Sequence, residues 1–182
     1  MSDPAAVLCG HGLAGRVRAW RRGPLVDSLT VRIPYRVFEV RVANAGRLER
    51  AWLAVDAVSG TLDPYRLEGP PEPGAPPEED ASPILPALVP PERLRGALLE
   101  RLRRQVYQRG FFRLRDLRLE AEDTGSLLYL AYCVGLRRKG ERLSVDVVAA
   151  ARGAREGGKL RDLIATWLAA GAPGGAGGPA ES

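Results

Sequence analysis

The chain has few of the residues that most often carry catalysis or bind metals. Among its 182 residues there are two cysteines, Cys9 and Cys133, and one histidine, His11. A zinc site needs three or four ligands, which Cys9 and His11 cannot supply alone. Nucleophilic catalysis needs a base held by an orienting group, and His11 has no identifiable acidic partner. We therefore expect no metal site and no enzymatic activity, and Cys133, within an apolar strand, to be a small core residue.

Long apolar runs are also missing. No stretch approaches the roughly 20 apolar residues that span a membrane. The N-terminus has neither the basic nor the apolar segment of a signal peptide. Apolar residues still make up 45% of the chain, which is typical of a globular protein. These features predict a cytoplasmic protein without a membrane partner.

Lysine is scarce, whereas arginine is abundant. Only Lys139 and Lys159 are lysines among 27 basic residues, and the formal net charge is +5. Asparagine is almost absent, and alanine, glycine and proline are frequent, as in a GC-rich coding bias. The excess of arginine is therefore weak evidence that each guanidinium was selected for its donors.

Proline is concentrated in one segment. Nine of the fifteen prolines lie in residues 69–91, together with four acidic residues. Proline fixes φ and removes backbone donors, so this segment should form a polyproline-like spacer outside any sheet or helix. Its later apolar residues, 84–85 and 88–89, should lie along a groove of a neighbouring half. The expected division is 1–68, a first α+β unit; 69–91, the acidic spacer; 92–170, a second α+β unit; and 171–182, a disordered tail.

Periodicity predicts the elements of the second half. Between Pro91 and Gly110, leucines recur every four residues, as in an amphipathic helix. Alternating residues then predict strands, and a C-terminal apolar stripe predicts a second helix. The expected elements are a helix at 91–109, a strand at 112–119, a turn at 122–125, strands at 127–136 and 143–151, and a helix at 159–170.

The first half has a similar but weaker pattern. A short helix is expected within residues 13–22, followed by a strand at 29–33. After Pro34, a strand at 35–42 leads into the hairpin signal Asn44-Ala-Gly46 and a strand at 48–58.

The two halves read as copies of one unit. Each has a Tyr-containing strand, a Gly turn and a second strand, around Tyr35 and around Tyr132, and each has a glycine about twenty residues earlier, Gly15 and Gly110. This internal duplication predicts an α+β fold of two related helix-plus-antiparallel-meander units, joined by the Pro-rich spacer. Because a unit of about 60 residues is marginally stable alone, the units should share a core.

Residues Val55-Asp-Ala-Val-Ser-Gly60, which follow a basic strand, resemble the VDAxTG strand and turn of PepSY-type modules. The similarity extends over residues 32–67 and, more faintly, 128–153. The resemblance implies tandem helix-plus-meander units with a non-enzymatic regulatory or interaction role. It identifies no residue as functional.

Two further patterns are better explained by structure than by chemistry. Residues 153–159 match the spacing of a phosphate-binding loop, but Leu160 stands where Ser or Thr would hold Mg²⁺. We expect a turn before a helix, and no nucleotide or other cofactor. Asp56, Asp63 and Asp146 have no motif that would hold them as an acid–base pair, and Asp56 could cap its own turn.

Arginines interleaved with aromatic residues are the strongest functional pattern, because basic surfaces with aromatics stack bases and bind phosphates. The candidate nucleic-acid or partner surface is Arg101, Arg104, Tyr107, Arg109, Phe111, Arg113, Arg115 and Arg118.

Together, these patterns favour a non-enzymatic intracellular adaptor or regulatory binding module. It would bind a protein partner through an exposed sheet face or edge, and a spare edge could also pair with a second copy as a homodimer. The alternative is a nucleic-acid-binding protein that uses the Arg/aromatic surface.

Overall fold

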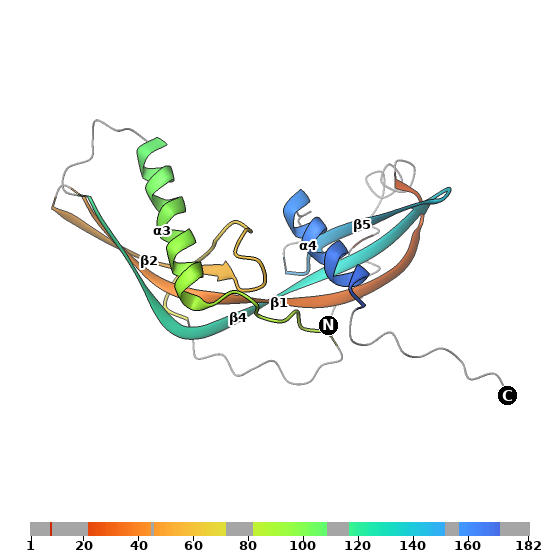
Figure 1. The fold of residues 1–182 in the computed structure, drawn as a ribbon, viewed down its shortest axis with the longest axis horizontal. Coiled ribbons are helices and arrows are strands. Elements are labelled where there is room, and N and C mark those ends of the chain that lie inside the picture. The colour runs from red at the N-terminus through yellow and green to blue at the C-terminus, as the bar shows by residue number, and fades with distance from the viewer. Residues whose placement is uncertain are drawn as a thin grey trace. The chain divides into compact units, whose positions relative to one another are not determined.

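The computed structural model describes Leu8 and residues 22–44, 46–71, 82–108, 117–151 and 157–171. Its elements are β1 (Leu25–Asn44), β2 (Arg47–Asp56), β3 (Tyr65–Leu67), α3 (Pro91–Gln108), β4 (Arg118–Lys139), β5 (Arg142–Ala149) and α4 (Gly158–Ala169). The strands form one five-stranded antiparallel sheet in the order β3-β2-β1-β4-β5 (Figure 1).

The prediction of two separate helix-plus-meander units is wrong. β1 and β4 are 20 and 22 residues long and are neighbours in the same sheet. The β1–β2 and β4–β5 hairpins therefore belong to one sheet. The described elements include two helices, α3 and α4. Sequence periodicity missed this because it predicted a strand break at Pro34 and a turn at 122–125, and both long strands continue through these points.

Strands β1 and β4 continue through Pro34 and Gly125, and cross-strand hydrogen bonds are kept at or beside both residues. The carbonyl of Pro34 accepts the N–H of Ala57 at 2.8 Å, so the residue loses only its own donor. Gly125 adopts φ +79°, as a turn glycine would. The hydroxyl of Thr124, however, donates to the carbonyl of Val37 on β1 at 2.9 Å. The turn signal thus marks a local distortion of β4, which still runs on to Lys139.

Local signals elsewhere were reliable. α3 begins at Pro91 and α4 within one residue of the expected start. The hairpin after Asn44 contains Gly46 at φ +75°, and the β4–β5 turn contains Gly140 at φ +59°. The segments around Tyr35 and Tyr132 are the first strands of two hairpins in the same sheet.

The chain divides into two compact units, each built from discontinuous segments. Unit 1 comprises Met1–Arg32, Glu79–Leu85 and Leu130–Ser182, and unit 2 comprises Ile33–Glu78 and Pro86–Tyr129. Both β1 and β4 contribute residues to each unit. The contiguous domain boundaries expected from the sequence stay a prediction.

Each unit has its own apolar cluster. In unit 2, Leu94 and Leu98 of α3 pack with Phe38 and Val55, and Figure 1 shows α3 lying across the strands of this unit. In unit 1, Cys133 and Val148 pack with Leu8 of the N-terminal segment, and α4 contacts β5. The expectation that Cys133 is a small core residue is confirmed.

The described end of the spacer packs on strands. The N–H of Arg32 donates to Pro83 and the N–H of Leu85 donates to Arg32, each at 2.9 Å, and Leu85 is buried. Separately, the N–H groups of Leu88 and Val89 donate to Ala57. Leu85 is buried and Val89 packs against the apolar cluster of unit 2, whereas the expected groove of a neighbouring half stays a prediction. Its exclusion from the sheet does not hold, since Ile84 forms a single parallel β-bridge with Arg32.

Two glycine substitutions should change stability in opposite directions. A Cβ at Gly135 would lie 2.6 Å from Cδ1 of Leu25 and 3.0 Å from Cδ1 of Leu8, so Gly135→Ala should destabilise the protein by about 1–3 kcal/mol. A Cβ at Gly96, within α3, would meet no atom within 4 Å, so Gly96→Ala should stabilise it by about 1 kcal/mol. Urea unfolding measures both changes. An unchanged midpoint for Gly135→Ala would show that both leucines move aside without cost.

Candidate functional site

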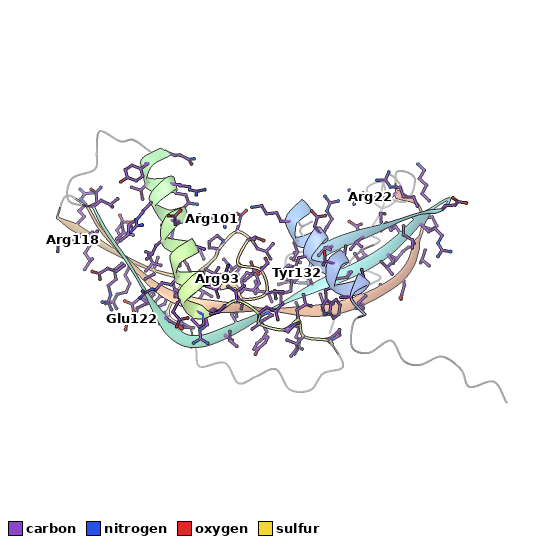
Figure 2. The ribbon with its side chains drawn as sticks, in the orientation of Figure 1. Arg22, Arg93, Arg101, Arg118, Glu122 and Tyr132 are labelled. Atoms are coloured by element: carbon purple, nitrogen blue, oxygen red, sulfur yellow. The ribbon has the colours of Figure 1, made fainter. Side chains whose placement is uncertain are left out.

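Half of the predicted Arg/aromatic surface can be located. Arg109, Phe111, Arg113 and Arg115 lie outside the described residues. Arg101, Arg104 and Tyr107 lie on α3, and Arg118 begins β4 (Figure 2).

The two α3 arginines of this surface have partners within the protein. Nη1 of Arg101 donates to the carbonyl of Leu62 at 2.8 Å, and Nη2 donates to the carboxylate of Asp63. Arg104 forms an i,i+4 ion pair with Glu100 at 3.4 Å. Arg101 therefore ties α3 to the segment after β2. A role of the surface in binding nucleic acid stays a prediction.

The turn that resembles the VDAxTG motif is organised by Asp56. Its Oδ1 accepts the N–H groups of Ser59 at 2.6 Å and Gly60 at 3.1 Å, and its Oδ2 accepts the N–H of Leu62 at 2.9 Å. Gly60 has φ +69°, a conformation that side chains rarely adopt. Asp56 is fully buried, and these bonds replace its water shell. The expectation that Asp56 caps its own turn is confirmed.

A second buried carboxylate, Asp146, is held by two arginines of unit 1. Its Oδ2 accepts Nε of Arg137 at 3.2 Å, and its Oδ1 accepts Nη1 of Arg22 at 3.3 Å. Arg137 is only 2% exposed, and its other nitrogens donate to the carbonyls of Gly23 at 3.3 Å and Leu8 at 2.9 Å. Three of these four bonds tie the N-terminal segment to the β4–β5 hairpin, and the Arg137–Asp146 bond joins the two strands of the hairpin itself.

Sequence reasoning missed the Arg137–Asp146 pair because the expected strand ends at residue 136, whereas β4 continues to Lys139. The hairpin itself offered a signal. Arg137 lies opposite Ser144, so Asp146, two residues further along β5, is its diagonal neighbour on the same face of the sheet. The acidic candidates Asp56 and Asp146 are both engaged in holding the fold.

Unit 2 contains a cleft of about 360 Å³ beside the first turn of α3. This volume lies within the range of small-molecule sites, roughly 300–1,000 Å³. The cleft lies between β1, β4 and the start of α3, and its lining is mostly charged. It is lined by Phe38, Glu39, Arg41, Pro91, Glu92, Arg95, Glu120, Ala121, Glu122 and Asp123.

Ion pairs compensate most of the charge around this cleft. Arg36 binds Asp123 through two parallel bonds of 2.8 and 2.9 Å. Arg41 lies between Glu39 at 2.9 Å and Glu122 at 3.3 Å, and its pKa is raised chiefly by the bond to Glu39.

The pairs also limit what the cleft can do chemically. Burial of Asp123 opposes its ionisation, but the hydrogen bond from Arg36 and the N–H of Gly125 outweigh it, so its pKa is lowered. A general acid at neutral pH needs a raised carboxyl pKa, so Asp123 is unsuited to that role.

β5 is the last strand in the sheet order, and among the described residues no strand pairs with its outer side. In an antiparallel pair, residues that exchange both backbone bonds alternate with residues whose N–H and C=O point away. The N–H of Ala150 donates to the carbonyl of Ala131 at 3.0 Å, so the backbone groups of Ala150 point toward β4. Counting back by twos along the β4–β5 register, the backbone groups that point away from β4 are those of Leu143, Val145, Val147 and Ala149.

The opposite edge is more protected. Ala57 donates to Pro34, so the outward-facing residues of β2 are the even-numbered ones. β3 pairs with Trp52 and Ala54. Before this pairing, the β2 residues whose backbone groups face outward are Leu48 and Arg50. Charged residues surround this short edge, and Arg50 forms an ion pair with Glu39 at 3.1 Å. Short length and charge are devices that prevent strand addition.

Stability should depend on pH through Arg36 and Asp123. The Asp123 carboxylate has a folded pKa below its ordinary value of 3.8, so the pair's contribution is complete above that pH and is lost as the pH falls through the folded pKa. Arg36→Gln should lower the unfolding free energy at neutral pH by up to about 1 kcal/mol. The difference from the parent protein should vanish in acid. Urea unfolding of both proteins from neutral to acidic pH measures the difference in unfolding free energy, and carboxyl ¹³C NMR measures the pKa of Asp123. A difference that persists at low pH would assign the effect to packing of the Arg36 stem.

The described residues contain no group of three His, Cys, Asp or Glu arranged to hold a metal ion. Within this part of the chain, no helix has the length and apolar character needed to cross a membrane. Cys9 and His11, which were not expected to form a metal site, and most of residues 153–159 lie outside the described residues. Comparisons with protein-family models, curated proteins and solved structures find no match. The resemblance to PepSY-type modules therefore stays a prediction.

Proposed function

We propose that the protein is a non-enzymatic intracellular adaptor or regulatory binding module that binds an extended segment of a partner protein at β5. The observation that carries this proposal is the row of outward-facing backbone groups at residues 143, 145, 147 and 149, at the end of the sheet. A peptide that adds as a new strand would satisfy these donors and acceptors, while its side chains provide specificity.

The difference between the two edges supports this choice of surface. β2 has only two outward-facing residues beyond β3, within a charged segment. β5 has four, and their side chains are all apolar. Natural sheets usually protect an edge with charge, proline or a bulge, and an unprotected edge recruits another strand. The exposed fraction of Leu143 is 56%, so this strand also offers apolar surface to a partner.

The state of the acidic residues supports a non-enzymatic role. Asp56 caps a turn, Asp146 binds two arginines, and Asp123 binds Arg36. Each carboxylate is occupied in holding backbone or a neighbouring strand. Acid–base catalysis would require such a group to exchange a proton with a substrate instead.

The nucleic-acid alternative has less structural support. Arg101 binds Leu62 and Asp63, and Arg104 pairs with Glu100, so neither presents an uncommitted guanidinium. Binding to phosphates would also weaken steeply with salt, which distinguishes it from strand addition.

A proline at the β5 edge should abolish partner binding without unfolding the sheet. Random 12-residue peptides, selected by display against the full chain, provide the probe. Leu143→Pro removes an outward-facing N–H and leaves the β4–β5 bonds intact, so it should weaken the selected peptides at least tenfold. Fluorescence anisotropy measures the dissociation constants.

Leu143→Ala is the matched control because it shortens the same side chain and keeps the N–H. It should lose only a small part of the affinity, and circular dichroism should show the same fold for both variants. Peptides that bind Leu143→Pro as tightly as the parent protein, or a selection that yields no binder, would contradict strand addition at β5.

A further inference from the structure

We propose that the segment bound at β5 runs antiparallel to β5 and carries acidic residues at its C-terminal end. This inference rests on the proposed strand addition at β5 and identifies the chemistry of the partner. It follows from the charge at one end of the strand, the direction of the sheet and the alternation of the β5 side chains.

The charge is concentrated at the start of β5. The β4–β5 hairpin ends in Arg138, Lys139, Glu141 and Arg142, all exposed, which give three positive charges against one negative. Arg137 does not add to this surface because it is buried against Asp146. A partner strand would therefore meet a local excess of positive charge at this end. Complementary charge there would favour one partner and one register.

The direction follows from the rest of the sheet. The strand pairs β1–β2, β2–β3 and β4–β5 are antiparallel, so an added strand that continues this pattern would also be antiparallel to its neighbour. Antiparallel bonds are perpendicular to the strands and slightly more stable per residue than parallel ones. Because β5 runs from Arg142 to Ala149, the C-terminal end of such a partner would lie beside Arg142.

The side chains of β5 select an alternating partner. Leu143 and Val145 share one face of the strand, and Arg142 and Ser144 share the other. Leu143 is exposed and Val145 is half-buried, so apolar partner residues on their face would bury surface. Polar residues would fit the face of Arg142 and Ser144. Each favourable cross-strand pair contributes about 0.2–1 kcal/mol.

Three synthetic peptides test the inference. Each alternates Thr and Val over eight residues and carries a fluorophore; one ends in three glutamates, one begins with three glutamates, and one ends in three lysines. Anisotropy with the full chain measures each dissociation constant at low and at physiological salt. The peptide with C-terminal glutamates should bind at least fivefold more tightly than either of the others, and this preference should shrink as salt rises.

Charge reversal locates the contact. Arg142→Glu should weaken the peptide with C-terminal glutamates about fivefold to tenfold and should strengthen the lysine peptide. Arg103→Glu, which makes the same change at an exposed position of α3, should leave both affinities unchanged. Circular dichroism and thermal unfolding check that both variants keep the parent fold.

The outcomes separate this inference from the proposed function. If all three peptides bind equally and Leu143→Pro weakens them all, strand addition stands and the acidic, antiparallel partner is wrong. Tighter binding of the peptide with N-terminal glutamates would replace the antiparallel direction with a parallel one. If display yields peptides sensitive to Leu143→Pro but the peptide with C-terminal glutamates does not bind, the partner chemistry is also wrong. Peptide binding that is insensitive to Leu143→Pro would overturn the proposed function itself.

Discussion

The hydrogen-bonded pairing of β1 with β4 is the constraint on which the rest of the structure depends. These strands occupy the centre of the five-strand order, and each continues into a hairpin with its own neighbour. The pairing joins segments far apart in the chain, as the Arg36–Asp123 pair shows across 87 residues. Such long-range contacts must overcome the entropy of closing a long loop before they contribute to stability. The two ion-pair bonds and the Thr124–Val37 bond reinforce this pairing within unit 2.

Buried charged residues of this basic chain hold its backbone. Asp56 satisfies three N–H groups of one turn, and Arg137 satisfies two carbonyls while it neutralises Asp146. Removing one partner of such a buried set leaves an unpaired charge, which is far more costly than losing an exposed ion pair. These side chains therefore act as structural connectors, and their burial is no sign of a reactive site.

This distribution of polar groups is the reason for proposing a binding role at the boundary of the sheet. The buried carboxylates Asp56 and Asp146 are matched by donors within the units. On the outer side of β5, by contrast, the register leaves backbone groups directed away from β4, where an added strand could pair with them. A sheet edge recognises the main chain of its partner, which gives affinity with little dependence on sequence. In the proposed complex, the charges of the β4–β5 hairpin would supply direction and selectivity. Strand addition of this kind requires neither histidine nor cysteine, both of which are scarce in the sequence.

The sequence by itself determined the features that arise from neighbouring residues. The four-residue spacing of Leu94 and Leu98 after Pro91 specifies α3, Asn44 and Gly46 specify a hairpin, and Asp56 caps the turn that follows it. Only the tertiary structure decided that the strands continue through Pro34 and Gly125, that Arg137 meets Asp146, and that β5 is the last strand in the order of the described sheet. Periodicity reports which face of an element is apolar, but partner choice depends on contacts between distant segments. For that reason the repeated hairpins could be recognised in the sequence, while their union in one sheet could not.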